Sequence, residues 1–155
     1  MQLEIQHDFR FGDRPPVPKP DPQFYQFLGE EGLRKLVSRH YDLLRKSRLR
    51  KMFPVDEEAF ELDKRNSADF FIQLMGVPDY YNQRRGRPAL VNRHSTFPIT
   101  PSGRDVWLSC YREALLETPV PDHLIHSFWN YLNVFSVWMV NSYTKIAPPT
   151  TKSTQ

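Results

Sequence analysis

The chain has very little cysteine and no long apolar run. Cys110 is its single cysteine, which excludes an internal disulfide and leaves no CxxC motif to bind zinc. One cysteine is typical of a reducing compartment, so we expect a cytoplasmic protein. No segment approaches the ~20 consecutive apolar residues of a membrane span, and the start, MQLEIQHDFRFGDR, lacks the apolar core of a signal peptide. The sequence predicts a soluble protein with no membrane contact.

The chain also lacks a large excess of positive or of negative charge. The net charge is +3 over 155 residues, so the basic pI of about 9.1 is a weak argument for nucleic-acid binding. What is abundant is aromatic: eleven Phe, seven Tyr and three Trp. A chain of this length builds one domain, and bulky aromatic side chains can line a large apolar pocket in it.

Sustained alternation of apolar and polar residues is absent, whereas apolar residues recur at three- and four-residue spacing. This pattern predicts an all-α fold. The expected helices are a short one opening at Phe24 and interrupted by Gly29, then 31–46, 56–75, one from about Ser102 with Asp105 as an acidic partner in its first turn, and 122–142. The apolar stripe of 122–142 is wide, so we expect that helix to be largely buried or to face a partner as well as the core.

The ends differ in composition from the rest. Residues 1–22 become RPPVPKPDP, which predicts an extended proline-rich arm that covers the core, joins subunits or has no role. Residues 146–155 have the composition of a flexible tail. The folded domain is expected at 23–145.

Three aromatic or basic side chains suggest one site. His94 follows a short turn and precedes the Phe97-Pro98 break, Tyr41 lies mid-face on its helix, and Trp107 lies on the inward face of the helix from Ser102. If they line one pocket, the Tyr41 O–H and Trp107 N–H are buried donors that a cofactor or its ligand would satisfy. His40, beside Tyr41, is expected to face away.

The run GVPDYYNQRRGRPALVNRHSTFPITPSGRDVWLSCYREAL, residues 76–115, resembles the most characteristic segment of group II truncated haemoglobins. The shared features are a Gly-x-Pro turn, a Tyr, an Arg-Gly-x-Pro element, an Arg-His pair followed by Phe, and a Trp-Leu-x-Cys helix. FYQFLGEEG, LVSRHY and LRKMFP match earlier elements of the family, so the resemblance covers about 24–143. This chain departs from the pattern at Glu30, Val77 and Arg87.

The resemblance implies a two-over-two helical globin that binds haem b, with His94 as the proximal iron ligand. It implies that Tyr41 and Trp107 donate hydrogen bonds to a bound diatomic ligand, with Ser67 as a third donor. Asp63 matches a position that gates the pocket, but a carboxylate there is expected to face solvent or pair with a cation.

The resemblance also implies contacts with the haem periphery. Arg93 is expected to bind a propionate, with Tyr81, Arg84 and Arg85 as further candidates, although the arginines could equally form a solvated basic turn. Aromatic packing against the haem is expected from Phe53, Phe70 and Phe97.

The function that follows is tight binding of O2, NO and CO, with nitric oxide dioxygenation or peroxidase-type chemistry as possible turnover. Turnover would need an electron-donating reductase, and the protein would be a monomer or homodimer. One alternative is a haem-free interaction module that docks through the wide stripe of 122–142. Another is a nucleic-acid binder using residues 84–87, which is disfavoured because the arginines cluster in one loop.

Overall fold

Helices account for the folded part of the chain. The computed structural model describes residues 1–75 and 98–142. Within these ranges there is no β-strand, which confirms the all-α prediction, and no helix is long and apolar enough to cross a membrane. The elements are α1 (Gln23–Arg45), the short 3-10 helix η1 (Arg50–Met52), α2 (Glu57–Leu74), α5 (Pro101–Leu116) and α6 (Asp122–Met139).

Helix α1 is kinked at Gly29, as its sequence predicts. Gly29 has φ 75° and ψ 173°, a backbone conformation that side chains with a Cβ rarely adopt. A Cβ built at this position would meet nothing within 4 Å. The requirement for glycine is therefore one of backbone conformation and not of space.

Side-chain caps set where two of the helices begin. The Asp56 carboxylate accepts a hydrogen bond from the Ala59 N–H at 2.8 Å, which starts α2 as expected. Helix α5 starts one residue before the expected position, because Thr100 Oγ1 accepts from the Gly103 N–H at 2.9 Å and Pro101 occupies the first turn. Asp105 has no capping role there; its carboxylate lies 3.0 Å from His7 Nε2.

Helix α6 ends at Met139, three residues before the predicted end at 142. The Asn141 and Ser142 N–H groups both donate to the Ile99 carbonyl, and Asn141 Oδ1 accepts from the Ile99 N–H at 2.8 Å. These bonds to the segment preceding α5 replace the bonds that would have continued the helix.

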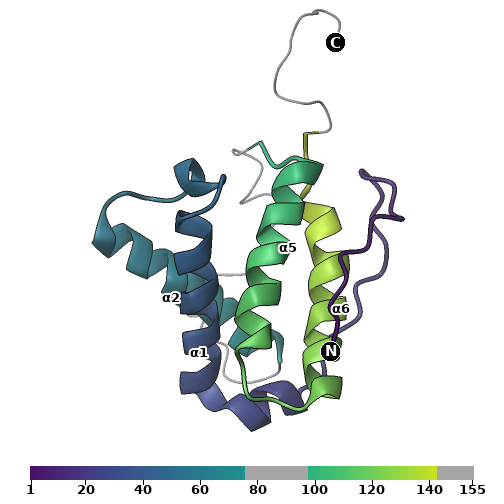
Figure 1. The fold of residues 1–155 in the computed structure, drawn as a ribbon, viewed down its shortest axis with the longest axis vertical. Coiled ribbons are helices and arrows are strands. Elements are labelled where there is room, and N and C mark those ends of the chain that lie inside the picture. The colour runs from purple at the N-terminus through teal and green to yellow at the C-terminus, as the bar shows by residue number, and fades with distance from the viewer. Residues whose placement is uncertain (76–97, 143–155) are drawn as a thin grey trace, which may run out of the picture.

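The helices form two pairs that share one core. Helix α1 packs against α2 and α5, and α6 packs against α5 and α1 (Figure 1). Phe24 at the start of α1 stacks on Phe128 of α6, with ring centroids 4.7 Å apart and the planes inclined by 5°. This arrangement is the two-over-two fold that the resemblance implies.

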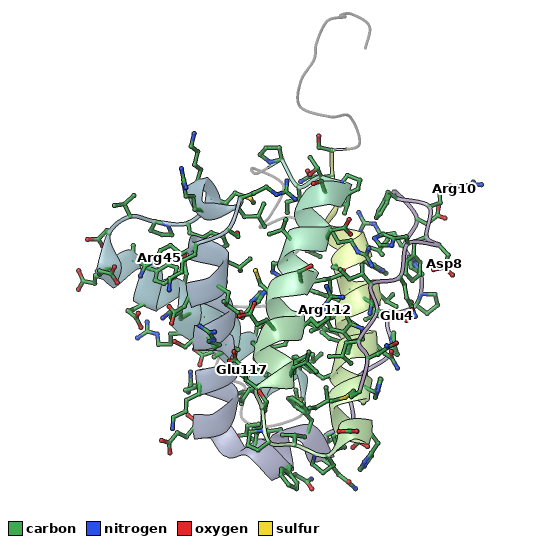
Figure 2. All side chains as sticks on the ribbon, in the orientation of Figure 1. Glu4, Asp8, Arg10, Arg45, Arg112 and Glu117 are labelled. Atoms are coloured by element: carbon green, nitrogen blue, oxygen red, sulfur yellow. The ribbon has the colours of Figure 1, made fainter. Side chains whose placement is uncertain are left out.

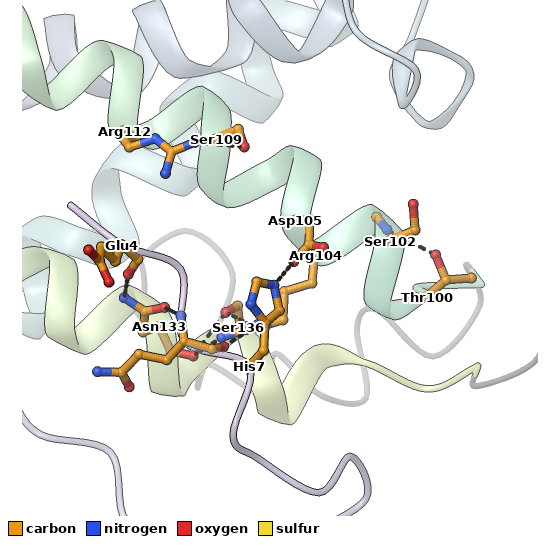
Figure 3. A network of polar contacts seen from close by, with 12 residues as sticks. Glu4, His7, Thr100, Ser102, Arg104, Asp105, Ser109, Arg112, Asn133 and Ser136 are labelled. Atoms are coloured by element: carbon orange, nitrogen blue, oxygen red, sulfur yellow. Dashed lines mark hydrogen bonds and ion pairs between the residues drawn. The ribbon is translucent and has the colours of Figure 1, made fainter. Parts of the chain in front are cut away.

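The N-terminal arm lies along α5 and α6 (Figure 1). Leu3 is buried in the core cluster, and the Trp129 indole N–H donates to the Glu4 carbonyl at 2.9 Å. Asn133, fully buried on α6, accepts from the Gln6 N–H at 2.9 Å (Figure 3). The arm thus covers the wide apolar stripe of α6, which removes the reason to expect a docking partner there.

Arg104 and Arg112 of α5 bind the arm from the other side. The Arg104 guanidinium is 2% exposed and donates to the Gln6 carbonyl, to the Asn133 carbonyl and to Ser136 Oγ (Figure 3). Arg112 points toward the arm beside Glu4 and donates to the carbonyl of residue 3 (Figure 2). Backbone carbonyls of an extended segment can accept these bonds because no helix uses them.

Asn133→Leu should loosen the arm. The substitution is similar in size but leaves the Gln6 N–H without its acceptor, so we expect a loss of about 2 kcal/mol in the free energy of unfolding and faster amide exchange in residues 3–7. Urea denaturation and hydrogen exchange measure the two effects. Asn130→Leu, at an exposed position of the same helix, is the control; equal losses in both variants would contradict the interpretation.

Candidate functional site

A cavity of about 390 Å³ opens between the two helix pairs. Helices α1, α2, α5 and α6 contribute to its wall, together with the segment that contains η1. Most of the lining is aromatic or aliphatic, with a few polar side chains among them. Its volume and its mostly apolar wall are typical of a small-molecule or cofactor site.

The described residues that the sequence singles out converge on this cavity. It is lined by Tyr41 of α1, Phe53 after η1, Ser67 and Phe70 of α2, and Trp107 of α5. Each of these side chains is half-buried. They come from segments far apart in the sequence, and tertiary packing brings them together.

The remaining predicted positions lie outside the described residues. They are the expected iron ligand, the expected propionate contacts and one aromatic contact: His94, Arg93, Tyr81, Arg84, Arg85 and Phe97. The short turn expected before His94 and the tail 146–155 lie outside them too.

Aromatic neighbours orient the two expected donors. The Tyr41 ring meets Phe53 edge-on at 5.5 Å between centroids. The Trp107 indole lies 5.0 Å from Tyr111 and 6.2 Å from Phe135. The edge-to-face contacts with Phe53 and Tyr111 favour defined ring orientations, so the polar end of each donor has a restricted direction.

Asp63 also lines the cavity. Its side chain is half-buried, and the expectation that it faces solvent or pairs with a cation stays a prediction. Asp63 precedes Ser67 by one turn of α2, which places both residues on the same face of that helix.

His40 contradicts the prediction that it faces away. It is 1% exposed and lines the cavity. Its Nε2 lies 3.1 Å from the Trp107 carbonyl oxygen, and its ring stacks on Tyr111 with centroids 3.4 Å apart. A carbonyl only accepts, so Nε2 carries the hydrogen and joins α1 to α5.

The sequence signal for His40 was present in the apolar stripe of its helix. Leu33, Leu36, Val37, His40 and Leu44 are all buried, and their spacing of three and four residues defines one helix face. Tyr41 fits the same stripe almost as well because adjacent positions are only about 100° apart around a helix. The cavity is wide enough for both residues to line it.

Burial sets the charge state of the groups around the cavity. Desolvation lowers the pKa of His40 from 6.5 to about 3, despite the opposing hydrogen bond to the Trp107 carbonyl. Burial raises the pKa of Tyr111 well above its ordinary value. Near neutral pH the His40 ring is therefore uncharged and the Tyr111 hydroxyl is protonated, while the buried Arg104 guanidinium supplies a positive charge to the wall.

His40 should make stability depend on pH. Because its pKa falls from 6.5 in the unfolded chain to about 3 in the folded one, the unfolded chain binds more protons between these values, and stability is lost as pH falls below about 6.5. We expect the parent to lose about 2 kcal/mol more than His40→Phe between about pH 7.5 and pH 5, measured by urea denaturation. His126→Phe, which removes an exposed histidine, should behave as the parent; identical pH profiles for the parent and His40→Phe would refute the buried neutral ring.

Comparison with known proteins places the chain in a family. A family model described as bacterial-like globin matches residues 23–141. The group 2 truncated hemoglobin YjbI of Bacillus subtilis is 32% identical over 118 residues, which cover 76% of this chain and 87% of the relative. A two-on-two hemoglobin-3 of Arabidopsis thaliana is 46% identical over 50 residues, 32% of this chain and 29% of the relative.

Solved structures agree with this assignment. Phosphate-bound Hell's gate globin IV superimposes with a TM-score of 0.82 at 36% identity, covering 96% of this chain and 91% of that one. The truncated oxygen-avid haemoglobin of Bacillus subtilis superimposes with a TM-score of 0.71 at 31% identity, covering 76% and 98%. The chain therefore belongs to the bacterial-like globins as a group II truncated haemoglobin, a haem protein that binds oxygen.

Proposed function

We propose that this globin holds haem b through the imidazole of His94 and retains oxygen through Tyr41 and Trp107. The observation that carries the proposal is that these two donors, on α1 and α5, line one cavity. The relative from Bacillus subtilis described as oxygen-avid supports the same function.

The residues of the cavity fit a flat apolar cofactor. Phe53, Phe70 and Phe135 of α6 line it with aromatic surface. Two buried polar atoms in the wall, on His40 and Tyr111, have no partner among the described residues. A cavity with apolar walls and a few convergent polar groups is what a cofactor with a small bound ligand requires.

Haem, when bound, supplies an iron whose open coordination position accepts a diatomic gas and passes electron density to it. Tyr41 O–H and Trp107 N–H are donors suited to a ligand that gains partial negative charge. In a site that excludes water, each neutral hydrogen bond contributes about 1 kcal/mol net, or roughly a fivefold slower release. Ser67 would be a third donor, unless its hydroxyl bonds within α2.

The proximal side is proposed from the sequence positions outside the described residues. His94 would bind the iron through one ring nitrogen, with the other nitrogen donating to an acceptor that fixes the tautomer. Arg93 would bind a propionate, with Tyr81, Arg84 and Arg85 as further contacts, and Phe97 would pack against the haem.

Strong retention of oxygen suits chemistry at the iron better than delivery, because delivery needs release. We propose nitric oxide dioxygenation, in which oxygen and nitric oxide would give nitrate and a reductase would return the oxidised iron to the ferrous state, or a peroxidase-type reaction, in which the electron donor would supply the two electrons that reduce peroxide to water. A cytoplasmic location, supported by the single Cys110, and a monomeric or homodimeric state complete the proposal.

His94→Ala should abolish normal haem binding. Loss of the proximal imidazole leaves the iron without its strong protein ligand, so the Soret band of the hemin-reconstituted variant should be lost or markedly shifted relative to the parent. His126→Ala, which removes an exposed histidine on α6, should give the parent spectrum. An unchanged Soret band in His94→Ala would exclude His94 as the ligand.

Tyr41→Phe and Trp107→Phe should each speed oxygen dissociation. Each variant removes one donor and keeps an aromatic ring, so we expect the dissociation rate constant to rise about fivefold or more, measured by stopped-flow mixing. Tyr25→Phe is the control, because Tyr25 lies on α1 but does not line the cavity. If neither distal variant releases oxygen faster than Tyr25→Phe, the donor assignment is wrong.

A further inference from the structure

Two buried polar atoms in the cavity wall have no hydrogen-bond partner in the described part of the chain. They are Nδ1 of His40 and the hydroxyl oxygen of Tyr111. Both residues line the cavity, and their exposed fractions are 1% and 0%. Buried polar atoms in native proteins are nearly always paired, so two such atoms on adjacent rings point to a missing partner.

The two atoms have opposite requirements. Nε2 of His40 donates its hydrogen to the Trp107 carbonyl. Nδ1 of the same neutral ring therefore carries no hydrogen and can only accept a hydrogen bond. The Tyr111 hydroxyl keeps its hydrogen and can donate it. His40 therefore needs a hydrogen-bond donor, and the Tyr111 hydroxyl needs an acceptor.

The rings cannot satisfy each other in this arrangement. His40 and Tyr111 are stacked with their planes inclined by 19° and their centroids 3.4 Å apart, and no hydrogen bond joins them. A hydrogen bond to Nδ1 has to approach in the plane of the imidazole, whereas Tyr111 lies over its face. Both residues line the cavity, so we place the missing partner there.

We propose that His40 and Tyr111 together bind a small hydroxylic molecule, the chemistry shared by water and hydrogen peroxide, which donates to Nδ1 and accepts from the Tyr111 hydroxyl. Such a molecule satisfies both atoms at once, and the cavity is many times larger than one water. Dioxygen has no hydrogen to donate and cannot satisfy Nδ1. The pair therefore distinguishes hydroxylic ligands from the diatomic gases that Tyr41 and Trp107 are suited to hold.

The proposed site differs from Tyr41 and Trp107 in the hydrogen bonds that it can form. Tyr41 and Trp107 offer hydrogens, which suits a ligand that only accepts. His40 is the neutral acceptor on the wall between them, next to Tyr41 in the chain and edge-on to the Trp107 indole at 5.2 Å between centroids. The experiment with hydrogen peroxide rests on the proposed haem function, whereas the experiment with water does not.

The first experiment tests the site with water alone. Histidine ¹⁵N resonances are recorded for the full chain, both without haem and as the diamagnetic carbon monoxide complex. We expect His40 to be the Nε2–H tautomer with its Nδ1 signal shifted upfield by a hydrogen bond, and to move toward the value of a free lone pair in Tyr111→Phe. Tyr131→Phe removes a buried hydroxyl from the same aromatic cluster outside the cavity lining and should leave the signal unchanged.

The second experiment tests hydrogen peroxide. The second-order rate constant for peroxide reacting with the ferric haem-loaded protein should fall about five- to tenfold in His40→Phe and in Tyr111→Phe. Tyr111→Phe is the decisive variant because it keeps the bond between His40 and the Trp107 carbonyl. Tyr131→Phe should react as the parent does.

The outcomes separate the possibilities. If the Nδ1 signal shows a hydrogen bond that is lost in Tyr111→Phe, and the rate constant for peroxide is unchanged in that variant, the bound molecule is water. If the Nδ1 signal and the rate constant for peroxide both change in Tyr111→Phe, the site binds peroxide as well. A protonated Nδ1, or an Nδ1 signal that is insensitive to Tyr111, overturns the inference. A parent chain that forms no Soret band would refute the haem proposal instead, and the measurement without haem would still decide whether the pair binds water.

Discussion

The hydrogen bond from the His40 ring to the Trp107 carbonyl joins the two helices on which the site depends. It fixes α1 against α5 at the level where both helices line the cavity. The bond comes from a ring that burial keeps neutral, so it does not place an unpaired charge in the core. Because Tyr41 is the next residue and Trp107 supplies the acceptor, the bond connects the two residues that are proposed to donate hydrogen bonds to oxygen.

A second polar network holds the arm, and through Arg104 it reaches the cavity wall. A buried guanidinium is costly unless its hydrogens are used, and Arg104 uses carbonyl and hydroxyl oxygens from the arm and from α6. The family model begins at residue 23, so the Gln6 carbonyl in this network comes from outside the matched region. The arm is thus an addition to the globin domain that shares its core through Leu3.

Most of the helical framework could be predicted from the sequence, because apolar spacing, Gly29 and the Asp56 cap are local signals. The errors concern contacts between segments distant in the chain. Helix α6 ends early because Asn141 forms hydrogen bonds with Ile99. The Asp105 carboxylate contacts His7 instead of capping α5. His40 is a different case: the spacing of Leu36, Val37 and Leu44 already puts it on the buried face, and the sequence prediction gave that place to Tyr41 alone.

Residue types and their spacing were enough to predict the all-α class, the resemblance to the family, and the pairing of Tyr41 with Trp107 in one pocket. That His40 joins them, and that the arm covers α6, depends on how distant segments pack. It also left Nδ1 of His40 and the Tyr111 hydroxyl without partners. Burial, hydrogen-bond pairing and charge state depend on which segments meet in space, and that is a property of packing that no local pattern contains.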